Sequence, residues 1–511
     1  MTWQNLVTCA LLGTERQAPE WPAGDDALGQ LLSRLDADDR EGALLRAAGV
    51  MALWRRAGHL LVHDPRPLPP PCEADDAPDC GPLARQHLAL MLQGHHAEFL
   101  LEWLKTLSVA GRRAPADLLP ALLEAGAARI GLRPALLPVL GQRGRWLAQQ
   151  NPAWGYAVQA DDENLWQTGQ FEERLALLRQ SRATRPDRAL ELLSATWAEE
   201  RAKQRREFIE ALAEGLSMAD EPFLEAALDD RSIEVTHAAA DLLARLPDSR
   251  LVQRLTVRAL QGVRFQPGRF FKHDRLEVEL PEDDPALRRD GIADPPSSVK
   301  LGEKAWRLSR MVGAIPPALW SQQWGRAPAE ILTVSRDSEW RPALLEGWAL
   351  ATQRHRDPDW AEALLPLYPD HDTLTAALAE LLPPARFESY LLGLLGDAST
   401  GGRAAALVLL SRVQRPWTVA LGRAVLGQVR QRVSEDKQPD WWLSNALRGF
   451  ARWLPPELSE EAAAGWPTEA KQWPQWQKAV NDLLDRLRFR RAMREAIAAE
   501  ESAQSDLPSL E

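Results

Sequence analysis

The sequence predicts an all-α protein: a HEAT-like α-solenoid of antiparallel helix pairs, with one irregular insertion that contains a candidate β-hairpin. The first observation is that residues 224–246 and 391–413 share one register without a gap. The second is that apolar residues recur at helical spacing along most of the chain. The third is that strict alternation of apolar and polar residues is clear only at residues 275–280.

Each of the two matched stretches reads as a helix, a turn that carries an aspartate, and a second helix that opens on alanines. The aligned pairs are Leu224 with Leu391, Leu228 with Leu395, Asp230 with Asp397, Ala238 with Ala405, Ala239 with Ala406 and Arg245 with Arg412. Alanines let two helices approach closely, and neighbouring units bury the leucines between them. We therefore expect stacked helix pairs.

The first predicted region, residues 1–160, is helical apart from a proline-rich loop at residues 65–80. Leu44, Ala48 and Met51 show the helical spacing that precedes this loop. The loop offers neither periodicity nor much apolar surface, so we expect it to be exposed.

The clearest repeats follow at residues 161–262, and residues 299–500 return to the same helical pattern. Between them, residues 263–298 break the rhythm and form the irregular insertion. We expect residues 501–511 to be a frayed tail. The chain has 21 tryptophans, which we expect to act as large wedges between packed helices.

The insertion is the first candidate for binding a partner, because long irregular segments in compact proteins are often functional. Aromatic side chains are favoured anchors, and a strand edge can add to a partner's sheet. The candidate residues are Phe270, Phe271, Leu276, Val278, Arg288, Arg289 and Asp290. The alternative is that the hairpin only covers the neighbouring helix pair and that the charged turn forms internal ion pairs.

A second candidate is the segment GQRGRW, in which Arg143 and Arg145 flank Gly144. Arginine suits bidentate recognition of carboxylate or phosphate. The alternative is that both arginines cap carbonyl groups or pair with nearby acids while Trp146 packs beneath them.

Composition restricts the classes of function. The formal net charge is −11, which argues against a general nucleic-acid or anionic-membrane binder, because both need a basic face. The three cysteines are too few for a disulfide framework, which favours a reducing compartment. With neither a signal peptide nor an apolar run long enough to span a membrane, the expected location is the cytoplasm.

Motifs that carry chemistry are missing from the sequence: it has no P-loop, no H-E-x-x-H, no nucleophile elbow and no dinucleotide fingerprint. His59, His63, Cys72, Cys80 and His87 are metal-ligand types, but the cysteines do not form a C-x-x-C pair. We therefore expect no catalytic residue, no cofactor and no metal.

Basic runs at residues 201–206 and 486–494 are the candidates for nucleic-acid contact. Acidic residues flank both runs, and charges of both signs at helical spacing usually form a solvated face. Nucleic-acid binding is the alternative function, and it is disfavoured.

Several segments in one order resemble a bacterial family that contains a domain of unknown function. The matching segments are LVTCALLGTERQ, LLEWLKTLSVAGRRAPADLLPALLE, VLGQRGRWLAQQNPAW, RRDGIADPP, LGEKAWRLSRMVGAIPPALW and LLEGWALATQRHRDPDWAEALL. Genes of this family commonly lie beside those for a SWIM zinc-finger protein, a MoxR-type AAA ATPase and a von Willebrand factor A-domain protein. The resemblance implies protein partners from that group.

The function expected from these observations is a non-enzymatic scaffold for protein–protein interaction. Solenoids present extended surfaces that suit macromolecular partners. The resemblance names the MoxR-type AAA ATPase and the von Willebrand factor A-domain protein as expected partners.

Overall fold

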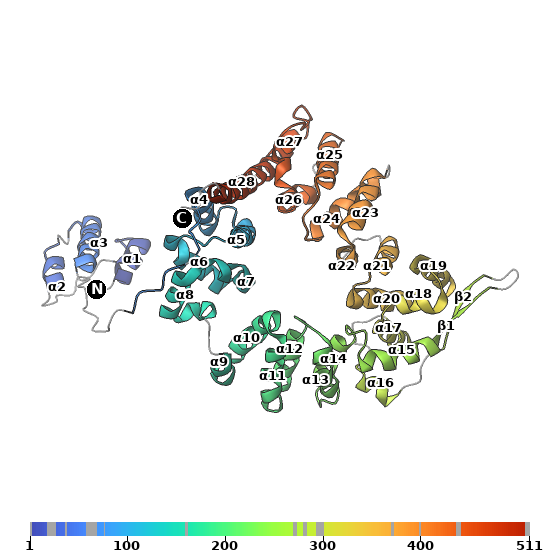
Figure 1. The fold of residues 1–511 in the computed structure, drawn as a ribbon. Coiled ribbons are helices and arrows are strands. Elements are labelled where there is room, and N and C mark those ends of the chain that lie inside the picture. The colour runs from blue at the N-terminus through green and yellow to red at the C-terminus, as the bar shows by residue number, and fades with distance from the viewer. Residues whose placement is uncertain are drawn as a thin grey trace. The chain divides into compact units, whose positions relative to one another are not determined.

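The computed structural model is predominantly helical and divides into two compact units, residues 1–71 and residues 72–511 (Figure 1). The structure describes residues 3–17, 27–35, 38–57, 69–75, 77–158, 162–268, 273–279, 284–292, 301–368, 373–397, 400–435 and 441–505. Within these residues, strand is confined to one two-stranded antiparallel sheet. The predicted all-α class is therefore confirmed.

Unit 1 contains three helices around a small core. They are α1 (Trp3–Leu12), α2 (Ala27–Leu32) and α3 (Arg40–Ala57). Leu6, Leu32, Ala47 and Met51 form the buried centre, and α3 contacts both other helices. Such a small core buries little apolar surface.

The first helices of unit 2 are α4 (Pro82–Leu92), α5 (Leu100–Val109), α6 (Leu119–Ala128), α7 (Arg133–Leu136) and α8 (Gly141–Gln150). Their leucines, with Phe99 and Trp103, form a core of their own. Proline occupies one of the first two positions of α4, α6 and α7, where its missing N–H costs no hydrogen bond.

Most described residues of the proline-rich loop are exposed, as composition predicts, but the end of the loop is anchored to the fold. Cys80 is buried, and the carboxylate of Asp75 accepts hydrogen bonds from the backbone N–H of Gln142 and the guanidinium of Arg113. An acid at a helix N-terminus satisfies N–H groups that lack partners within the helix, here those of α8. The loop is thus held by a helix cap, which hydrophobic periodicity does not reveal.

The next helices are α9 (Asp162–Thr168), α10 (Phe171–Thr184), α11 (Pro186–Thr196), α12 (Ala202–Ala211), α13 (Glu221–Ala227), α14 (Ile233–Leu243) and α15 (Arg250–Gly262). Asp230 lies in the turn between α13 and α14, where it pairs with Arg205 and accepts from the backbone N–H of Ser232. Ala239 of α14 is fully buried, as the repeat alignment predicts.

The insertion begins with the predicted hairpin. Strand β1 (Val263–Gln266) pairs antiparallel with β2 (Arg275–Val278), and Val263 faces Val278 in the register. Leu276 and Val278 are half-buried and pack against the large core. Phe270, Phe271 and Leu280 lie outside the described residues. Helix α16 (Pro285–Arg289) follows the hairpin.

The remaining helices before the C-terminal one are α17 (Glu303–Val312), α18 (Ala318–Trp324), α19 (Pro328–Val334), α20 (Arg341–His355), α21 (Pro358–Leu364), α22 (Thr373–Leu381), α23 (Pro384–Gly396), α24 (Thr400–Arg412), α25 (Val419–Glu435), α26 (Trp441–Phe450) and α27 (Ser459–Ala463). Ala406 of α24 is fully buried, like its aligned partner Ala239. Helices contact one another in series along the chain: α10 contacts α12, which contacts α14, and a second series runs through α17, α20, α22, α24 and α26. Helix α15 contacts both α14 and α17 and so joins the two series. This order of contacts is that of a helical solenoid.

Tryptophans fill the interior of this stack, as the composition predicts. Trp103, Trp166, Trp320, Trp348, Trp360 and Trp476 are among the largest fully buried side chains. Trp348 and Trp360 lie 5.3 Å apart between ring centroids and join α20 to α21. No helix among the described residues is long and apolar enough to cross a membrane.

The C-terminal helix α28 (Trp473–Ser505) joins the end of unit 2 to its beginning (Figure 1). It contacts α26 and also α4 and α5. Its first half contributes Trp476, Val480 and Leu487 to the large core. Its second half contributes Met493 and Ile497 to the core built by α4–α8. One helix therefore belongs to two cores.

Ion pairs and rings line the junction between the halves of α28. Arg490 is buried, with its Nε 2.6 Å from a Glu102 carboxylate oxygen and its Nη1 2.6 Å from the Leu454 carbonyl oxygen. Phe489 stacks on His96 at 4.2 Å and meets His87 edge-on at 5.2 Å. Burial lowers the pKa of His87 and of His96, and for His96 it outweighs the opposing charge of Asp485.

The buried alanines give the first prediction. Ala239→Leu and Ala406→Leu should each lower the free energy of unfolding by about 1–3 kcal/mol, because added methylenes overpack a helix junction. Ala420→Leu on the exposed face of α25 is the matched control and should change it little. Denaturant unfolding of the three variants measures the difference. Equal effects at the buried and exposed sites would show that the repeat alignment does not mark helix contacts.

The histidines at α28 give a pH prediction. Their pKa values lie below the unfolded value of about 6.5, so the unfolded state binds protons more readily in that range. Their contribution to stability is fully present above the unfolded pKa of about 6.5, and it is lost as the pH falls through the lowered pKa values of the folded state. The thermal midpoint should therefore drop between about pH 8 and about pH 5. The double variant His87→Gln, His96→Gln should show a smaller drop in the thermal midpoint. An unchanged drop would show that these histidines do not cause it.

Candidate functional site

The charged turn of the insertion, residues 288–290, is tied to the rest of the fold by ion pairs. Arg289 pairs with Asp229 at 2.7 Å and with Glu225 at 3.0 Å. Asp290 is buried and pairs with Arg254 at 2.6 Å. Hydrogen bonds to Asp229 and Glu225 raise the pKa of the Arg289 guanidinium. Both side chains thus take part in structural ion pairs, while Arg288 is exposed.

Arg143 and Arg145 lie on α8 with exposed side chains. Within the described residues, neither guanidinium forms a hydrogen bond or an ion pair. Gly144 is buried, and a Cβ atom there would lie 2.8 Å from the Cβ of Leu140, so the helix turn requires a glycine. The structure does not bring these two arginines together with the insertion.

Half of the cations in the first basic run and most of those in the second form ion pairs within the fold. In the first run, Arg205 pairs with Asp230, and Arg206 with Glu210 and Glu234. In the second run, the pairs are Arg486 with Glu98, Arg490 with Glu102, Arg491 with Glu460 and Glu495, and Arg494 with Glu102. A nucleic-acid surface needs cations that face the solvent without partners, so this pairing disfavours it.

One hollow among the described residues is here called the Arg310 pocket. Its volume is about 190 Å³, and α14, α15, α17, α20 and the turn after α16 surround it. The lining residues are His237, Ala240, Asp241, Ala244, Leu251, Leu255, Asp290, Gly291, Ile292, Trp306, Arg310, Ala314 and Arg354. Apart from Leu251 and Leu255 of α15, they come from the matched repeat unit at residues 224–246 and from three segments that carry the family resemblance.

The turn after α16 reaches the pocket through a close contact with α14. Gly291 has a φ of +78°, and a Cβ atom there would lie 2.4 Å from the Cβ of Ala240. Glycine adopts this backbone conformation without strain and leaves room for the alanine. The pair therefore places Asp290 and Ile292 in the wall of the pocket.

Arg354 of α20 forms the polar floor. Its Nη2 lies 2.7 Å from an Asp241 carboxylate oxygen, and its Nη1 donates to the Gly313 carbonyl oxygen at 2.9 Å. Its Nε is buried without a hydrogen-bond partner in the described residues. Burial lowers the pKa of Arg354. Burial also acts to raise the pKa of Asp241, but Arg354 and Arg245 outweigh it and lower that pKa.

Arg310 of α17 has no carboxylate in ion-pair contact among the described residues. Within the described residues its guanidinium forms no hydrogen bond and no ion pair, and it lies 4.7 Å from the Trp306 ring centroid. Burial and the charge of Arg310 lower the pKa of His237. Burial raises the pKa of Glu346, and the charge of Arg310 opposes this effect.

The lining favours binding over catalysis. Among the described lining residues there is no serine, threonine, cysteine or lysine to act as a nucleophile. Asp241 and Asp290 are both held in ion pairs by arginines, and for Asp241 this pairing lowers the pKa and makes it a weak base. Burial and Arg310 lower the pKa of His237, which favours its neutral form, and its ring has no hydrogen bond to an acid among the described residues. The arrangement can hold an anion on fixed positive charge.

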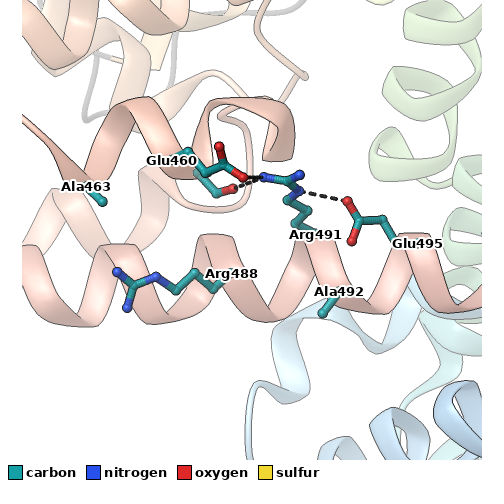
Figure 2. A pocket seen from close by; sticks show the side chains of 7 residues that line it. Glu460, Ala463, Arg488, Arg491, Ala492 and Glu495 are labelled. Carbon is teal, nitrogen blue, oxygen red and sulfur yellow. Dashed lines mark hydrogen bonds and ion pairs between the residues drawn. The ribbon is translucent and has the colours of Figure 1, made fainter.

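Two other hollows are more open. One, of about 480 Å³, lies beside Arg310, Glu346 and Tyr368. Another, of about 350 Å³, lies between α27 and α28. Figure 2 shows that Arg491 in the latter is held between Glu460 and Glu495, while Arg488 points away. The Arg491 guanidinium has two carboxylate partners, so this hollow is an ion-pair contact between α27 and α28.

Residues of metal-ligand type do not gather in the described part of the chain, which contains no cluster of three or more histidine, cysteine or acidic side chains. Cys72 is half-buried and Cys80 is buried, while His59 and His63 lie outside the described residues.

The sequence did not predict that Arg310, Arg354 and His237 line one pocket. Asp290 is the one sequence-predicted candidate that lines the pocket. The family resemblance gave a partial signal, because three of the six segments that carry it meet at this pocket. Nothing in their spacing shows that they meet.

Comparison with known proteins gives one match. The model of a family of unknown function, DUF5691, matches residues 5–497. No curated protein matches the sequence.

The shared acceptor Asp241 gives the third prediction. Arg354→Gln removes the buried ion pair and the bond to Gly313, and should lower the free energy of unfolding by about 1–3 kcal/mol. Arg245 pairs with the same carboxylate at 2.6 Å from an exposed position. Arg245→Gln is therefore the matched control and should cost less than about 0.5 kcal/mol. Urea unfolding distinguishes them, and equal costs would refute a structural role for Arg354.

Proposed function

The chain belongs to the family of unknown function DUF5691, and from this premise we propose that it is a non-enzymatic helical-repeat scaffold that binds other proteins. Helix pairs of HEAT-like type, stacked in series, form its larger unit. Solenoids of this kind offer long surfaces to macromolecular partners. The ion-paired state of the acids in the Arg310 pocket supports binding rather than catalysis.

The observation that carries the proposal is the exposed apolar surface of unit 1. Seven of the large apolar side chains of this small unit are exposed: Val7, Leu11, Leu12, Leu31, Leu45, Leu53 and Trp54. Leu11 and Leu45 are the most exposed of these, at 81% and 74%. Large apolar side chains gathered on the surface of a small unit are typical of protein interaction sites.

The helical geometry places several of these side chains on common faces. Val7 and Leu11 lie one turn apart on α1, so they share a face of that helix. Leu45 and Leu53 are about two turns apart on α3, which contacts α1. Apolar residues at these spacings can pack against a partner helix.

The partners we propose are a MoxR-type AAA ATPase and a von Willebrand factor A-domain protein. This assignment rests on the family-level gene neighbourhood. An AAA ATPase requires ATP, so the proposal places the complex in the cytoplasm. Nucleic acid is a weaker candidate, because both basic runs are engaged in ion pairs within the fold.

The test is reconstitution with the two purified partners. We expect a stable complex by size-exclusion chromatography with light scattering. The variant Leu11→Glu, Leu45→Glu should lose the complex, because it places charge on the docking surface. The control is Val109→Glu, at an 87% exposed apolar position of unit 2, which should retain it.

Two outcomes would contradict the proposal. One is the absence of any complex with the folded wild-type chain. The other is equal loss of the complex in the unit 1 variant and in the Val109 control. Circular dichroism of each variant verifies that the helices are intact.

A further inference from the structure

We propose that the Arg310 pocket binds a carboxylate carried on a compact apolar body. The proposal concerns unit 2 and does not depend on the docking surface of unit 1. It rests on three features of the pocket, as the described residues form it: an arginine without a carboxylate in ion-pair contact, a buried donor without an acceptor, and an apolar volume of matching size.

The first feature is the Arg310 guanidinium. Nearly every buried arginine at the neighbouring helix junctions has a carboxylate partner, as Arg354 has Asp241 and Arg205 has Asp230. Arg310 has none among the described residues, although it is half-buried. A planar guanidinium offers parallel N–H groups that match the two oxygens of a carboxylate.

The second feature is the Nε of Arg354. It is buried and makes no hydrogen bond in the described residues, while the two terminal nitrogens of the same side chain are satisfied. A buried donor without an acceptor costs free energy, so an acceptor that enters the pocket is favoured there. Arg310 and Arg354 both line the same hollow.

The third feature is the apolar wall. Leu251, Leu255, Ile292 and the Trp306 ring line the volume of about 190 Å³. A cavity of about 150 Å³ lined by apolar side chains accommodates benzene. The pocket therefore has room for a body of that size with a carboxylate attached.

The charges that line the Arg310 pocket favour a ligand with a single negative charge. Asp241 and Asp290 also line the pocket, but Arg354 neutralises Asp241 and Arg254 neutralises Asp290. Arg310 leaves a surplus of one positive charge, which suits a carboxylate. A phosphate dianion would bring its second charge close to the two aspartates and would be repelled.

A carboxylate on an apolar body has two sources. It is a small free acid, or it is the C-terminal residue of a protein chain. The two share their chemistry and differ in the amide group that joins a C-terminal residue to its chain. Suitable probes are para-fluorobenzoate for the free acid and N-acetyl-leucine for the C-terminus.

The experiment is fluorine NMR of para-fluorobenzoate with the full-length chain. We expect saturable broadening of the ligand signal. The neutral isostere para-fluorobenzamide should bind at least about tenfold more weakly, because charge-assisted hydrogen bonds are lost. Displacement by N-acetyl-leucine assigns the site to a C-terminus, and failure of displacement assigns it to a free acid. Inorganic phosphate should not displace the probe.

Variants locate the site. Arg310→Gln should weaken binding by at least about tenfold, and Arg310→Lys should weaken it less, because the charge remains while the fork is lost. The matched control is Lys304→Gln, which removes one positive charge from an exposed position of the same helix. It should leave the affinity unchanged.

Three results would overturn the assignment. They are no saturable binding of para-fluorobenzoate to the wild-type chain, equal binding of the neutral isostere, and equal weakening in Arg310→Gln and Lys304→Gln. The comparison of probe and isostere uses the wild-type chain, so it decides the question even if Arg310→Gln does not fold.

Discussion

The packing of α28 into two hydrophobic cores is the constraint on which unit 2 depends. Trp476 and Val480 belong to the core of the long helical stack, while Met493 and Ile497 belong to the core of α4–α8. Arg490 lies between them and ties Glu102 to the Leu454 carbonyl group. A repeat protein normally has contacts only between neighbouring units, so its ends are the least stable parts. Here the C-terminal helix supplies part of the first core, which links the stability of the two ends.

The same stacking explains why a pocket forms between α14, α17 and α20. Small residues bring helices close together where they cross, as Gly291 does on Ala240, and as Gly347 does on Val312, where a Cβ atom would lie 2.8 Å from the valine Cβ. Large side chains such as Trp306 then surround the remaining space. Buried arginines at these junctions require carboxylate partners, and Asp241 and Asp290 meet that requirement for Arg354 and Arg254. Arg310 is the exception, and it faces the hollow that this packing leaves.

The helical class, the hairpin and the buried alanines follow from periodicity, because each reflects a local repeat of apolar residues. Ala239 and Ala406 are buried where the alignment of residues 224–246 with 391–413 places them. The pocket does not follow from periodicity, because Asp241 and Arg354 are 113 positions apart and meet only through the stacking of α14, α17 and α20. The junction of Arg490 with Glu102, separated by 388 positions, is equally invisible to local pattern. The flanking acids of the basic runs indicate local pairing, as Arg206 with Glu210 and Arg491 with Glu495. The distant partners Asp230 and Glu102 do not follow from sequence.

The most direct test of the two-core role of α28 is hydrogen exchange with mass spectrometry on a chain that ends after residue 488. The account predicts that amides of α4–α8 lose protection, because Phe489, Met493 and Ile497 no longer complete their core. Amides of α17 and α20, which belong to the other core, should keep theirs. Unchanged protection of α4–α8 in the shortened chain would contradict the account, since the first core would then be stable without the C-terminal helix.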